Sequence, residues 1–463
     1  MKSHARVTSI VLSVVLVVIV SGCGGGSPQT QPPPHVSTWT WVSGANTFNQ
    51  DAIYGTEGTA SPSNVPGARS GAASWIDTSG NLWLFGGIYE TSNATTGGLS
   101  DLWKFDGINW TWVSGPNVGD QPGVYGTLGQ ASPSNVPGAR SDSISWIGSG
   151  GIFWLFGGFG NAFSVSNSGN LNDLWKFDGT NWTWVSGANI ADELGVYGAQ
   201  GMPSASNVPG GRQGSVSWID HAGNLWLFGG YGRDSTAGNG RLNDLWKFDG
   251  TNWTWVSGAN IVDQAGAYGT KGTPSPSNVP GARNLADSWI DGSGNFWLFG
   301  GFGADSAGTT GRLNDLWKFD GTNWTWVSGA NIVDQTGAYG TKGTPSPSNA
   351  PGARNQAVSW TDGSGNLWLF GGLGVDSSGV TDVLNDLWKF DGNNWTWVSG
   401  ANTANQTGIY GTKGTPSKSN TPGSRASSAA WIDKQGSLWL FGGVRFDFPP
   451  GTNEFNDLWR FTP

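Results

Sequence analysis

The sequence predicts an all-β fold, and three observations lead to this prediction. The motif WLFGG recurs six times along the 463 residues, at steps of 71 or 72. Each repeat contains four short runs in which apolar and polar residues alternate, as they do in half-buried strands. After residue 38 no helical period of apolar residues is visible. Six four-stranded units of even period are typical of a β-propeller, so we expect a six-bladed ring spanning residues 39–463.

The strands of the first unit illustrate the pattern. A tight turn at 77–80 joins the first two strands, and the dipeptide Asp106-Gly107 joins the third and fourth. The predicted strands of this unit are Arg69–Ile76, Asn81–Phe85, Asp101–Phe105 and Asn109–Val113.

The loop lengths predict two different faces. In a propeller, first-to-second and third-to-fourth connections lie on one face, and the remaining connections lie on the other. The first face has only turns of about four residues. Second-to-third connections such as 302–312 have about a dozen residues, and fourth-to-first connections such as 259–281 exceed twenty. We therefore expect one long-loop face on a rigid scaffold, which is where binding sites usually occur.

The phase of the repeat predicts how the ring closes. The chain opens with a fourth-strand sequence, Trp39–Gly44, and ends after a third-strand sequence, Asn456–Phe461. The last unit thus lacks an outer strand that the N-terminal segment can supply. Pairing the two ends would close the ring and remove open sheet edges.

The repeat resembles the kelch motif: an arginine opens the first strand, Gly-Gly ends the second, and tryptophans are spaced along the third and fourth. The resemblance implies a kelch-repeat β-propeller of the galactose-oxidase central-domain-like superfamily, and the N-terminal segment described below adds the expectation of a bacterial lipoprotein. Galactose oxidase itself needs histidine copper ligands and a tyrosine crosslinked to cysteine. The repeats contain no cysteine and only His221, so that activity is excluded. A sialic-acid mutarotase, which is also a six-bladed kelch propeller, remains an alternative.

The N-terminus is predicted to be an export signal. Lys2 and Arg6 precede an apolar run at 7–20 that is too short to span a membrane. The sequence 20–23 resembles a bacterial lipobox, in which Cys23 would be lipidated after removal of residues 1–22; the alternative is an ordinary signal peptide with a chance cysteine. Residues 23–38 form a Gly- and Pro-rich tether. Gly24, which is not aspartate, favours the outer membrane, with a periplasmic or surface location.

Composition excludes several classes of partner and cofactor. The net charge of −9 argues against binding to nucleic acid or directly to anionic membranes. One cysteine and three scattered histidines exclude a disulfide framework and a Cys- or His-rich metal centre. We expect no cofactor. Calcium is a smaller possibility, because 234–236 and 305–308 offer carboxylate and hydroxyl oxygens.

An arginine opens each innermost strand, and six copies would bring guanidinium groups to the channel mouth. They could bind a carboxylate bidentately. By resemblance, equivalent arginines in some kelch proteins bind acidic peptides or an acidic sugar. The alternative is that each arginine pairs with the aspartate of its DLW motif. The candidate arginines are Arg69, Arg140, Arg212, Arg283, Arg354 and Arg425, and the aspartates are Asp101, Asp173, Asp244, Asp315, Asp386 and Asp457.

The long loops repeat a tyrosine that supplies contact area for a partner. A residue present in all six loops also fits a structural role, in which it holds its own loop in shape. The same choice applies to a repeated asparagine. The tyrosines are Tyr54, Tyr125, Tyr197, Tyr268, Tyr339 and Tyr410, and the asparagines are Asn64, Asn135, Asn207, Asn278, Asn349 and Asn420.

Residues that break the repeat are the remaining candidates. Asp142 and Asp287 are unusual acids on innermost strands and are weak candidates for general acid–base groups in the channel. Local pairing with arginine is the alternative. The glutamates, including Glu90 and Glu454, fall in predicted loops, where an exposed glutamate is ordinary.

No motif identifies an enzyme. We therefore expect a lipid-anchored, monomeric binding or scaffolding protein that engages a protein or glycan through its long-loop face. A kelch-type sugar-modifying enzyme is the alternative.

Overall fold

The computed structural model describes residues 1, 37–90, 96–447 and 451–463. The predicted export signal, Cys23 and most of the tether lie outside the described residues. The chain divides into two units, Met1–Val36 and Ser37–Pro463, and the strands belong to the second. Within the described ranges, no helix is long and apolar enough to cross a membrane.

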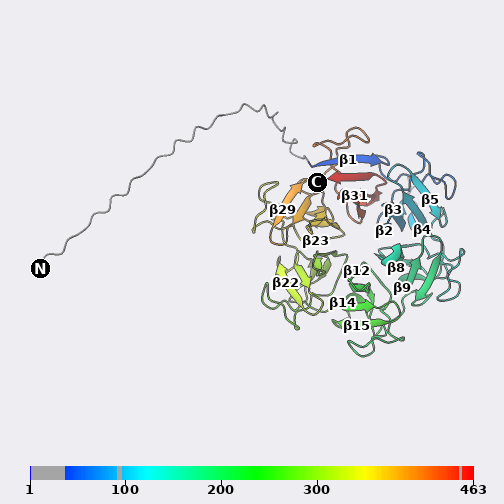
Figure 1. Ribbon diagram of the computed structural model, residues 1–463, viewed down its shortest axis with the longest axis horizontal. Helices are drawn as coiled ribbons and strands as arrows, with labels where there is room; N and C mark the ends of the chain where they lie inside the picture. Colours follow the sequence, from blue (N-terminus) through cyan, green and yellow to red (C-terminus); the bar gives the residue numbers. More distant parts are fainter. Residues whose placement is uncertain (2–36, 91–95, 448–450) are drawn as a thin grey trace. The chain divides into compact units, whose positions relative to one another are not determined.

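Each repeat forms an antiparallel sheet with four main strands, which we call a blade, and a two-residue strand adds a fifth in the second and third blades. In Figure 1 the blades follow one another around a common centre, with short innermost strands facing it. The innermost strands are β2 (Ala73–Ile76), β7 (Ile144–Ile147), β12 (Val216–Ile219), β17 (Asp287–Ile290), β24 (Val358–Thr361) and β30 (Ala429–Ile432). The second strands are β3 (Leu82–Glu90), β8 (Phe153–Asn161), β13 (Leu225–Arg233), β18 (Phe296–Phe299), β25 (Leu367–Phe370) and β31 (Leu438–Phe441).

The outer half of each blade carries the tryptophan-rich motifs. The third strands are β4 (Thr96–Phe105), β9 (Ser168–Phe177), β14 (Asn239–Phe248), β21 (Leu316–Phe319), β28 (Leu387–Phe390) and β34 (Leu458–Thr462). The fourth strands are β5 (Trp110–Ser114), β10 (Trp182–Ser186), β15 (Trp253–Ser257), β22 (Trp324–Ser328), β29 (Trp395–Ser399) and β1 (Thr38–Ser43).

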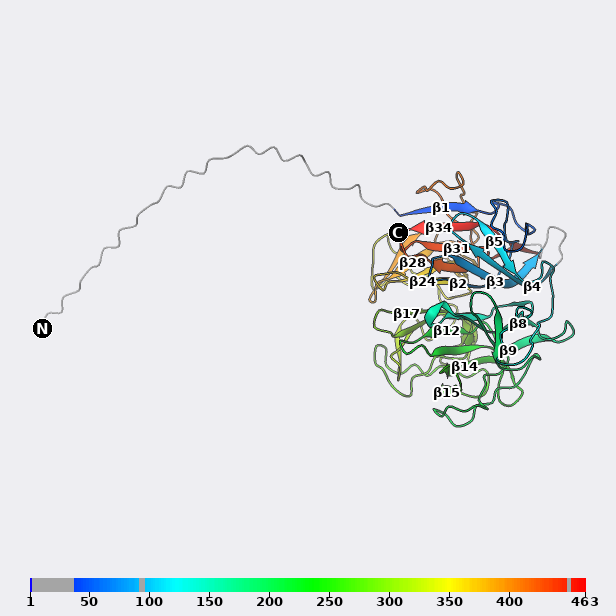
Figure 2. The ribbon, with the colours of Figure 1, turned by 45° about the vertical axis from the view of Figure 1, so that its right-hand side comes forward.

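The N-terminal strand completes the last blade, as the phase of the repeat predicts. β1 pairs with β34 in the register Trp39↔Phe461 and Trp41↔Trp459, and the two strands lie side by side in Figures 1 and 2. A lysine from the preceding long loop adds a clamp: the Lys413 ammonium lies 4.4 Å from the Trp41 ring centroid and donates to the Gly44 carbonyl at 2.7 Å.

The innermost strands contact one another in a cycle that returns from β30 to β2. Above them, six backbone N–H groups donate in turn around the axis, each to the carbonyl of the preceding blade, at 2.6–2.9 Å. All six donors have left-handed φ values between 52° and 63°. This hydrogen-bonded ring closes the circle independently of β1. Its members are Gly71, Asp142, Gly214, Leu285, Gln356 and Ser427.

The hydrophobic core lies between neighbouring blades. One cluster joins Trp75 and Phe85 of the first blade to Trp175 and Trp182 of the second. The DLW tryptophans are among the largest fully buried side chains. Large aromatic rings bury enough area to fill the wedge between twisted sheets, which explains the use of five tryptophans per repeat.

Strands extend further into the long-loop face than the sequence predicts. β3 continues to Glu90 and β4 begins at Thr96. The later blades place separate short hairpins here, so the second-to-third loops are shorter than predicted. These hairpins are β19 (Phe302–Ala304) with β20 (Thr310–Arg312), β26 (Leu373–Val375) with β27 (Thr381–Val383), and β32 (Val444–Asp447) with β33 (Gly451–Glu454).

In four blades the opening arginine begins a two-residue strand. These strands pair with β8, β13, β19 and β26. The two-residue strands are β6 (Arg140–Ser141), β11 (Arg212–Gln213), β16 (Arg283–Asn284) and β23 (Arg354–Asn355). A single 3-10 turn, η1 (Ser149–Gly151), is the one helical element among the described residues.

Candidate functional site

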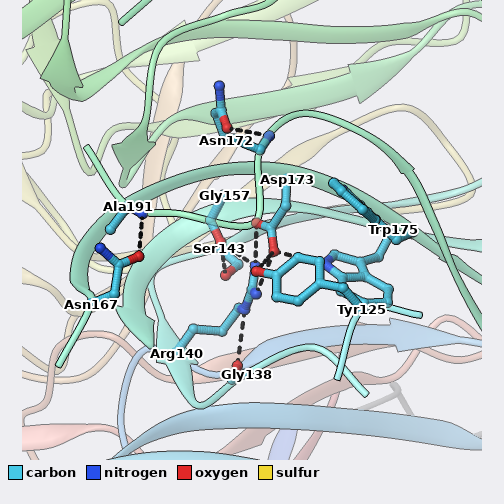
Figure 3. Close-up of polar contacts among 12 residues, drawn as sticks. Tyr125, Gly138, Arg140, Ser143, Gly157, Asn167, Asn172, Asp173, Trp175 and Ala191 are labelled. Atoms are coloured by element: carbon cyan, nitrogen blue, oxygen red, sulfur yellow. Dashed lines mark hydrogen bonds and ion pairs between the residues drawn. The ribbon is translucent and has the colours of Figure 1, made fainter. Parts of the chain in front are cut away.

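The strand-opening arginines are buried inside their own blades, where each forms an ion pair. Arg140 donates from both terminal nitrogens to the two carboxylate oxygens of Asp173, at 2.7 Å each. It also donates to the Gly138 and Gly157 carbonyls at 3.0 Å (Figure 3). Burial lowers the pKa of Arg140, but Asp173 outweighs this effect and holds the pKa above its ordinary value. The salt bridges are Arg69–Asp101, Arg140–Asp173, Arg212–Asp244, Arg283–Asp315, Arg354–Asp386 and Arg425–Asp457.

This geometry corrects the prediction that these six arginines bind a ligand. A bidentate pair at full burial leaves no guanidinium face exposed to an incoming anion. Removing one partner would strand an uncompensated charge, so the pair is structural once formed. The alternative, pairing with the DLW aspartate, is the arrangement found in every blade.

The repeated tyrosines complete the same cluster. Tyr125 donates its hydroxyl to Asp173 at 2.8 Å, and Trp175 donates its indole N–H to the same oxygen at 2.7 Å (Figure 3). Burial, followed by the aspartate charge, raises the pKa of Tyr125. Tyr125, Tyr197, Tyr268 and Tyr339 are buried, which corrects their predicted binding role. Tyr54 and Tyr410 make the same hydrogen bond but are only half-buried.

The repeated asparagines hold the long loops in shape. Asn64 donates to the carbonyls of Thr59 and Trp110, at 2.9 and 3.1 Å, and so ties its loop to the fourth strand. The equivalent asparagine in each of the other five loops makes the same two kinds of bond. The repeated asparagines therefore stabilise the loops that carry them.

The two inner-strand acids lie in different surroundings. Asp142 is a member of the hydrogen-bonded ring and lines a small cavity on the axis. Burial raises its pKa to about 6, although the neighbouring Ser141 acts in the opposite direction. Asp287 is 4% exposed and occupies a position that is Val216 or Val358 in other blades. Burial raises its pKa to about 8, partly offset by the charge of Arg354. Neither acid forms a salt bridge with arginine within the described ranges.

Glu454, predicted in an exposed loop, is instead buried on β33 at 2% exposure. One carboxylate oxygen accepts a hydrogen bond from the Ser70 hydroxyl at 3.0 Å, and the other has no partner among the described residues. Burial raises its pKa to about 8, and the charges of Glu90 and Asp142 add to the rise. The prediction of an ordinary loop glutamate is therefore wrong for this residue.

Arg241 and Arg312 occupy the position of Glu454 in the third and fourth blades. Their guanidinium carbons lie 4.5 and 5.8 Å from the Phe302 ring centroid. The buried Nε of each has no hydrogen-bond partner within the described part of the chain. These two arginines, and not the strand-opening ones, bring partly exposed positive charge to the long-loop face.

A cavity of about 420 Å³ lies on the long-loop face beside the first blade. Tyr54 and Arg69 form part of its lining, together with Tyr89 and Glu90 from the end of β3. The loop before the first blade and the loop after it contribute the remaining walls. The other lining residues are Gln50, Asp51, Ala52, Gly67, Ala68, Leu99, Asn117, Val118 and Gly119.

No family model matches the chain. The kelch domain-containing protein 3 of Bos taurus and that of Homo sapiens are each 27% identical over 198 residues. Each match covers 41% of this chain and spans 41% of the relative's length. The leucine-zipper-like transcriptional regulator 1 homolog of Drosophila melanogaster is 24% identical over 58% of this chain and 22% of its own length. The similarity to kelch relatives agrees with the repeated antiparallel sheets of four main strands. The chain is a kelch-repeat β-propeller.

Solved structures with a related fold include one titled "Structure of YjhT", with a TM-score of 0.49 at 15% identity, covering 85% of the kelch propeller chain and 95% of its own. A fungal alcohol oxidase of the AA5 family in complex with copper has a TM-score of 0.45 at 13% identity, and the match covers 89% of this chain and 76% of the oxidase chain.

The loops considered for calcium use their carboxylates internally. Asp234 of the kelch propeller accepts hydrogen bonds from the backbone N–H groups of Thr236 and Gly238, at 2.7 and 2.8 Å. Burial raises its pKa, but these bonds outweigh that effect and lower it. Asp305 makes the equivalent bonds to Ala307 and Thr309. A calcium ion would have to displace these donors. The described residues contain no group of three or more His, Cys, Asp or Glu side chains placed to hold a metal.

Proposed function

We propose that this kelch propeller is an exported, lipid-anchored protein of the bacterial cell envelope, attached through Cys23, that binds a protein or glycan partner through its long-loop face. The observation that carries the proposal is the position of the 420 Å³ cavity and the long loops on that face. Long loops on a rigid scaffold are the usual location of binding surfaces, and a cavity of this size falls within the range of ligand pockets.

The point at which the chain enters the propeller supports this orientation. Thr38 pairs with Thr462, at the end of the third strand, where the short turns lie. A tether from Cys23 therefore joins the short-turn face. Anchoring at that face leaves the opposite, long-loop face available for a partner.

Lipid attachment is tested on the full chain. Wild type should incorporate a labelled fatty acid and fractionate with membranes, whereas Cys23→Ser should do neither. Incorporation of label into the Cys23→Ser protein would refute the anchor. Binding is tested by titrating the purified protein with panels of peptides and oligosaccharides. Substitutions on the long-loop face should abolish the interaction, and Ile108→Ala on the short-turn face, where Ile108 is 82% exposed, should not.

A second candidate is a sugar-modifying enzyme, and one observation favours it. Asp142 and Glu454 lie near the channel mouth with pKa values of about 6 and 8, in the range that suits proton transfer near neutral pH. Arg241 and Arg312 could hold a carboxylate of an acidic sugar. Anomer exchange of sialic acid, followed by NMR, tests this activity. The binding proposal predicts no acceleration, and acceleration that Asp142→Asn and Glu454→Gln abolish would favour the enzyme.

A further inference from the structure

Two residues that line the 420 Å³ cavity, Tyr89 and Asp51, occur once among the six repeats. The position of Tyr89 is a glycine in the second to fifth blades and Arg445 in the sixth. The position of Asp51 is proline, leucine, alanine or threonine in the other long loops. A side chain that every blade needs for folding recurs in all six. These two do not recur, so they are the candidates for a role that the first blade alone performs.

The repeated polar residues of the cavity wall are already committed to structure. Arg69 donates from both terminal nitrogens to the Asp101 carboxylate, at 2.6 and 2.8 Å. Tyr54 donates its hydroxyl to the same carboxylate at 2.9 Å. Arg69 is the only cation among the described lining residues. An anionic ligand would therefore find no free cation here, and it would meet the exposed carboxylate of Asp51.

Uncharged polar groups of the wall remain free. The Gln50 side chain donates from its amide nitrogen to the Phe48 carbonyl at 2.8 Å, which leaves its amide oxygen able to accept. The Asn117 amide and the Tyr89 hydroxyl have no hydrogen-bond partner among the described residues. Burial and two nearby acidic charges raise the pKa of Tyr89, so its hydroxyl keeps its proton and can both donate and accept. The wall thus offers donors and acceptors to a ligand that carries several hydroxyl groups.

Apolar surface lies beside these groups. Leu99 and Val118 contribute aliphatic side chains to the lining, and Tyr89 contributes an aromatic ring. The ring fits closely against two glycines: a Cβ atom would lie 2.9 Å from the Tyr89 Cε1 atom at Gly97 and 2.7 Å from it at Gly119. A larger residue at either glycine would displace the ring. The backbone around Tyr89 therefore holds the ring in place.

This combination matches a neutral sugar better than it matches other classes of ligand. A pyranose ring has a C–H face that packs on an aromatic ring, and its hydroxyls both donate and accept hydrogen bonds. A basic side chain would engage Asp51, whose exposed charge is screened by salt, and would leave the uncharged groups of the wall unused. An acidic sugar would need a cation that this wall does not supply.

We propose that this cavity, called the Tyr89 cavity from here on, binds one neutral sugar residue of a glycan. The C–H face of the sugar packs on the Tyr89 ring. Its hydroxyls form hydrogen bonds with Gln50, Asp51 and Asn117. This inference rests on the proposed function, because it places the partner on the long-loop face. It narrows that function from a protein or glycan to a glycan with an exposed neutral residue.

The test titrates the full-length protein, in a detergent without a sugar headgroup, with the methyl glycosides of glucose, galactose, mannose and N-acetylglucosamine, followed by saturation-transfer NMR. Methyl glucuronide is the matched anion, because it differs from methyl glucoside by one carboxylate group. We expect at least one neutral glycoside to bind at least fivefold more tightly than the glucuronide. Raising salt from 50 to 500 mM should change its affinity less than twofold, because the ligand carries no charge. The proposal is overturned if none of the four glycosides binds, or if the glucuronide binds most tightly.

Four variants locate the binding. Tyr89→Gly introduces the residue found in four other blades and should fold while weakening the glycoside at least tenfold, and Tyr89→Phe should cost less because it keeps the ring. Asp51→Ala, at an exposed residue, should weaken binding several-fold without affecting the fold. The matched control is Tyr231→Ala, which removes a tyrosine of β13 outside the cavity and should leave the affinity unchanged. Unchanged affinity in Tyr89→Gly, or a loss confined to Tyr231→Ala, would overturn the proposal.

The outcomes also separate this inference from the proposed function. If a peptide binds the long-loop face and no neutral glycoside does, the sugar inference fails while the binding function stands. If a glycan binds that face independently of Tyr89, again only the inference fails. If no ligand of either class binds that face, both fail.

Discussion

Replacing the buried acid Asp287 with valine should stabilise the propeller, and the gain should grow with pH. Equivalent positions in two other blades are Val216 and Val358, so a valine side chain fits this part of the core. One Asp287 carboxylate oxygen is buried with no hydrogen-bond partner among the described residues. Burial raises the pKa of Asp287 from 3.8 to about 8.

The sign and size of the effect follow from this pKa. The folded state holds the proton more tightly than the unfolded chain, so the acid lowers stability as pH rises from about 4 to about 8. Each pKa unit is worth about 1.4 kcal/mol. Between pH 5 and pH 9 the free energy of unfolding of the wild type should fall, relative to Asp287→Val, by about 4 kcal/mol. This is an upper estimate, because Asp287 also lines a cavity on the axis that water can enter.

The assay is urea unfolding followed by tryptophan fluorescence at pH 5, 7 and 9. Asp287→Asn is the matched control, because it keeps the polar group and removes the charge. Both variants should lack the pH-dependent loss, and Asp287→Val should be the more stable at every pH. A wild-type-to-variant difference that stays constant from pH 5 to 9 would refute the reasoning.

Three further predictions concern the ring and the ion pairs. At one position of the innermost strands, a serine hydroxyl donates to a backbone carbonyl of the preceding blade; Ser145, for example, donates to the Ser74 carbonyl at 3.2 Å. The sixth blade has Ala430 at this position and lacks the hydroxyl. Ala430→Ser should add a bond worth about 1 kcal/mol and raise the melting temperature; an unchanged or lower value would contradict this. Lys413→Met should speed hydrogen exchange in β1, because the Lys413 ammonium contacts Trp41 and Gly44 of that segment. The control is Lys342→Met, which removes the equivalent contacts with Trp397 and Gly400 and should leave exchange in β1 unchanged. Arg140→Leu should destabilise the protein by about 3–5 kcal/mol in urea unfolding, because it leaves a buried carboxylate unpaired; a loss below 1 kcal/mol would contradict the buried-pair account.

The features that repeat six times could be predicted from the sequence. Strand order and the pairing of the N-terminal strand with the last blade follow from the phase and period of the repeat, and the structure agrees. The presence of an arginine at the start of each innermost strand could also be read from the repeat. Whether these arginines are free to bind a ligand could not be predicted. That depends on whether the DLW aspartate, some 32 residues further along the chain, folds against the same guanidinium group.

The features that occur once were harder to predict. Tyr89 stands out only when the end of the second strand is compared across blades, where the other residues include Gly160 and Gly232. Its side chain lines the 420 Å³ cavity, which no periodicity encodes. Glu454 could have been found in the same way, since it replaces Arg241 and Arg312 at one repeat position. Comparing repeats position by position is therefore the signal that locates the candidate site.

A partner that occupies the long-loop face of the anchored protein should shield that face from a reagent in intact envelopes. Single cysteines at Val118, which is 56% exposed and lines the 420 Å³ cavity, and at Ile108, on the short-turn face, test this directly. Each would be labelled with a small maleimide in intact envelopes and in the purified protein, with Cys23 blocked by its lipid. We expect slower labelling of Val118→Cys in envelopes than in the purified protein, and equal labelling of Ile108→Cys in both. Equal labelling of Val118→Cys in both, or protection at Ile108→Cys alone, would contradict it.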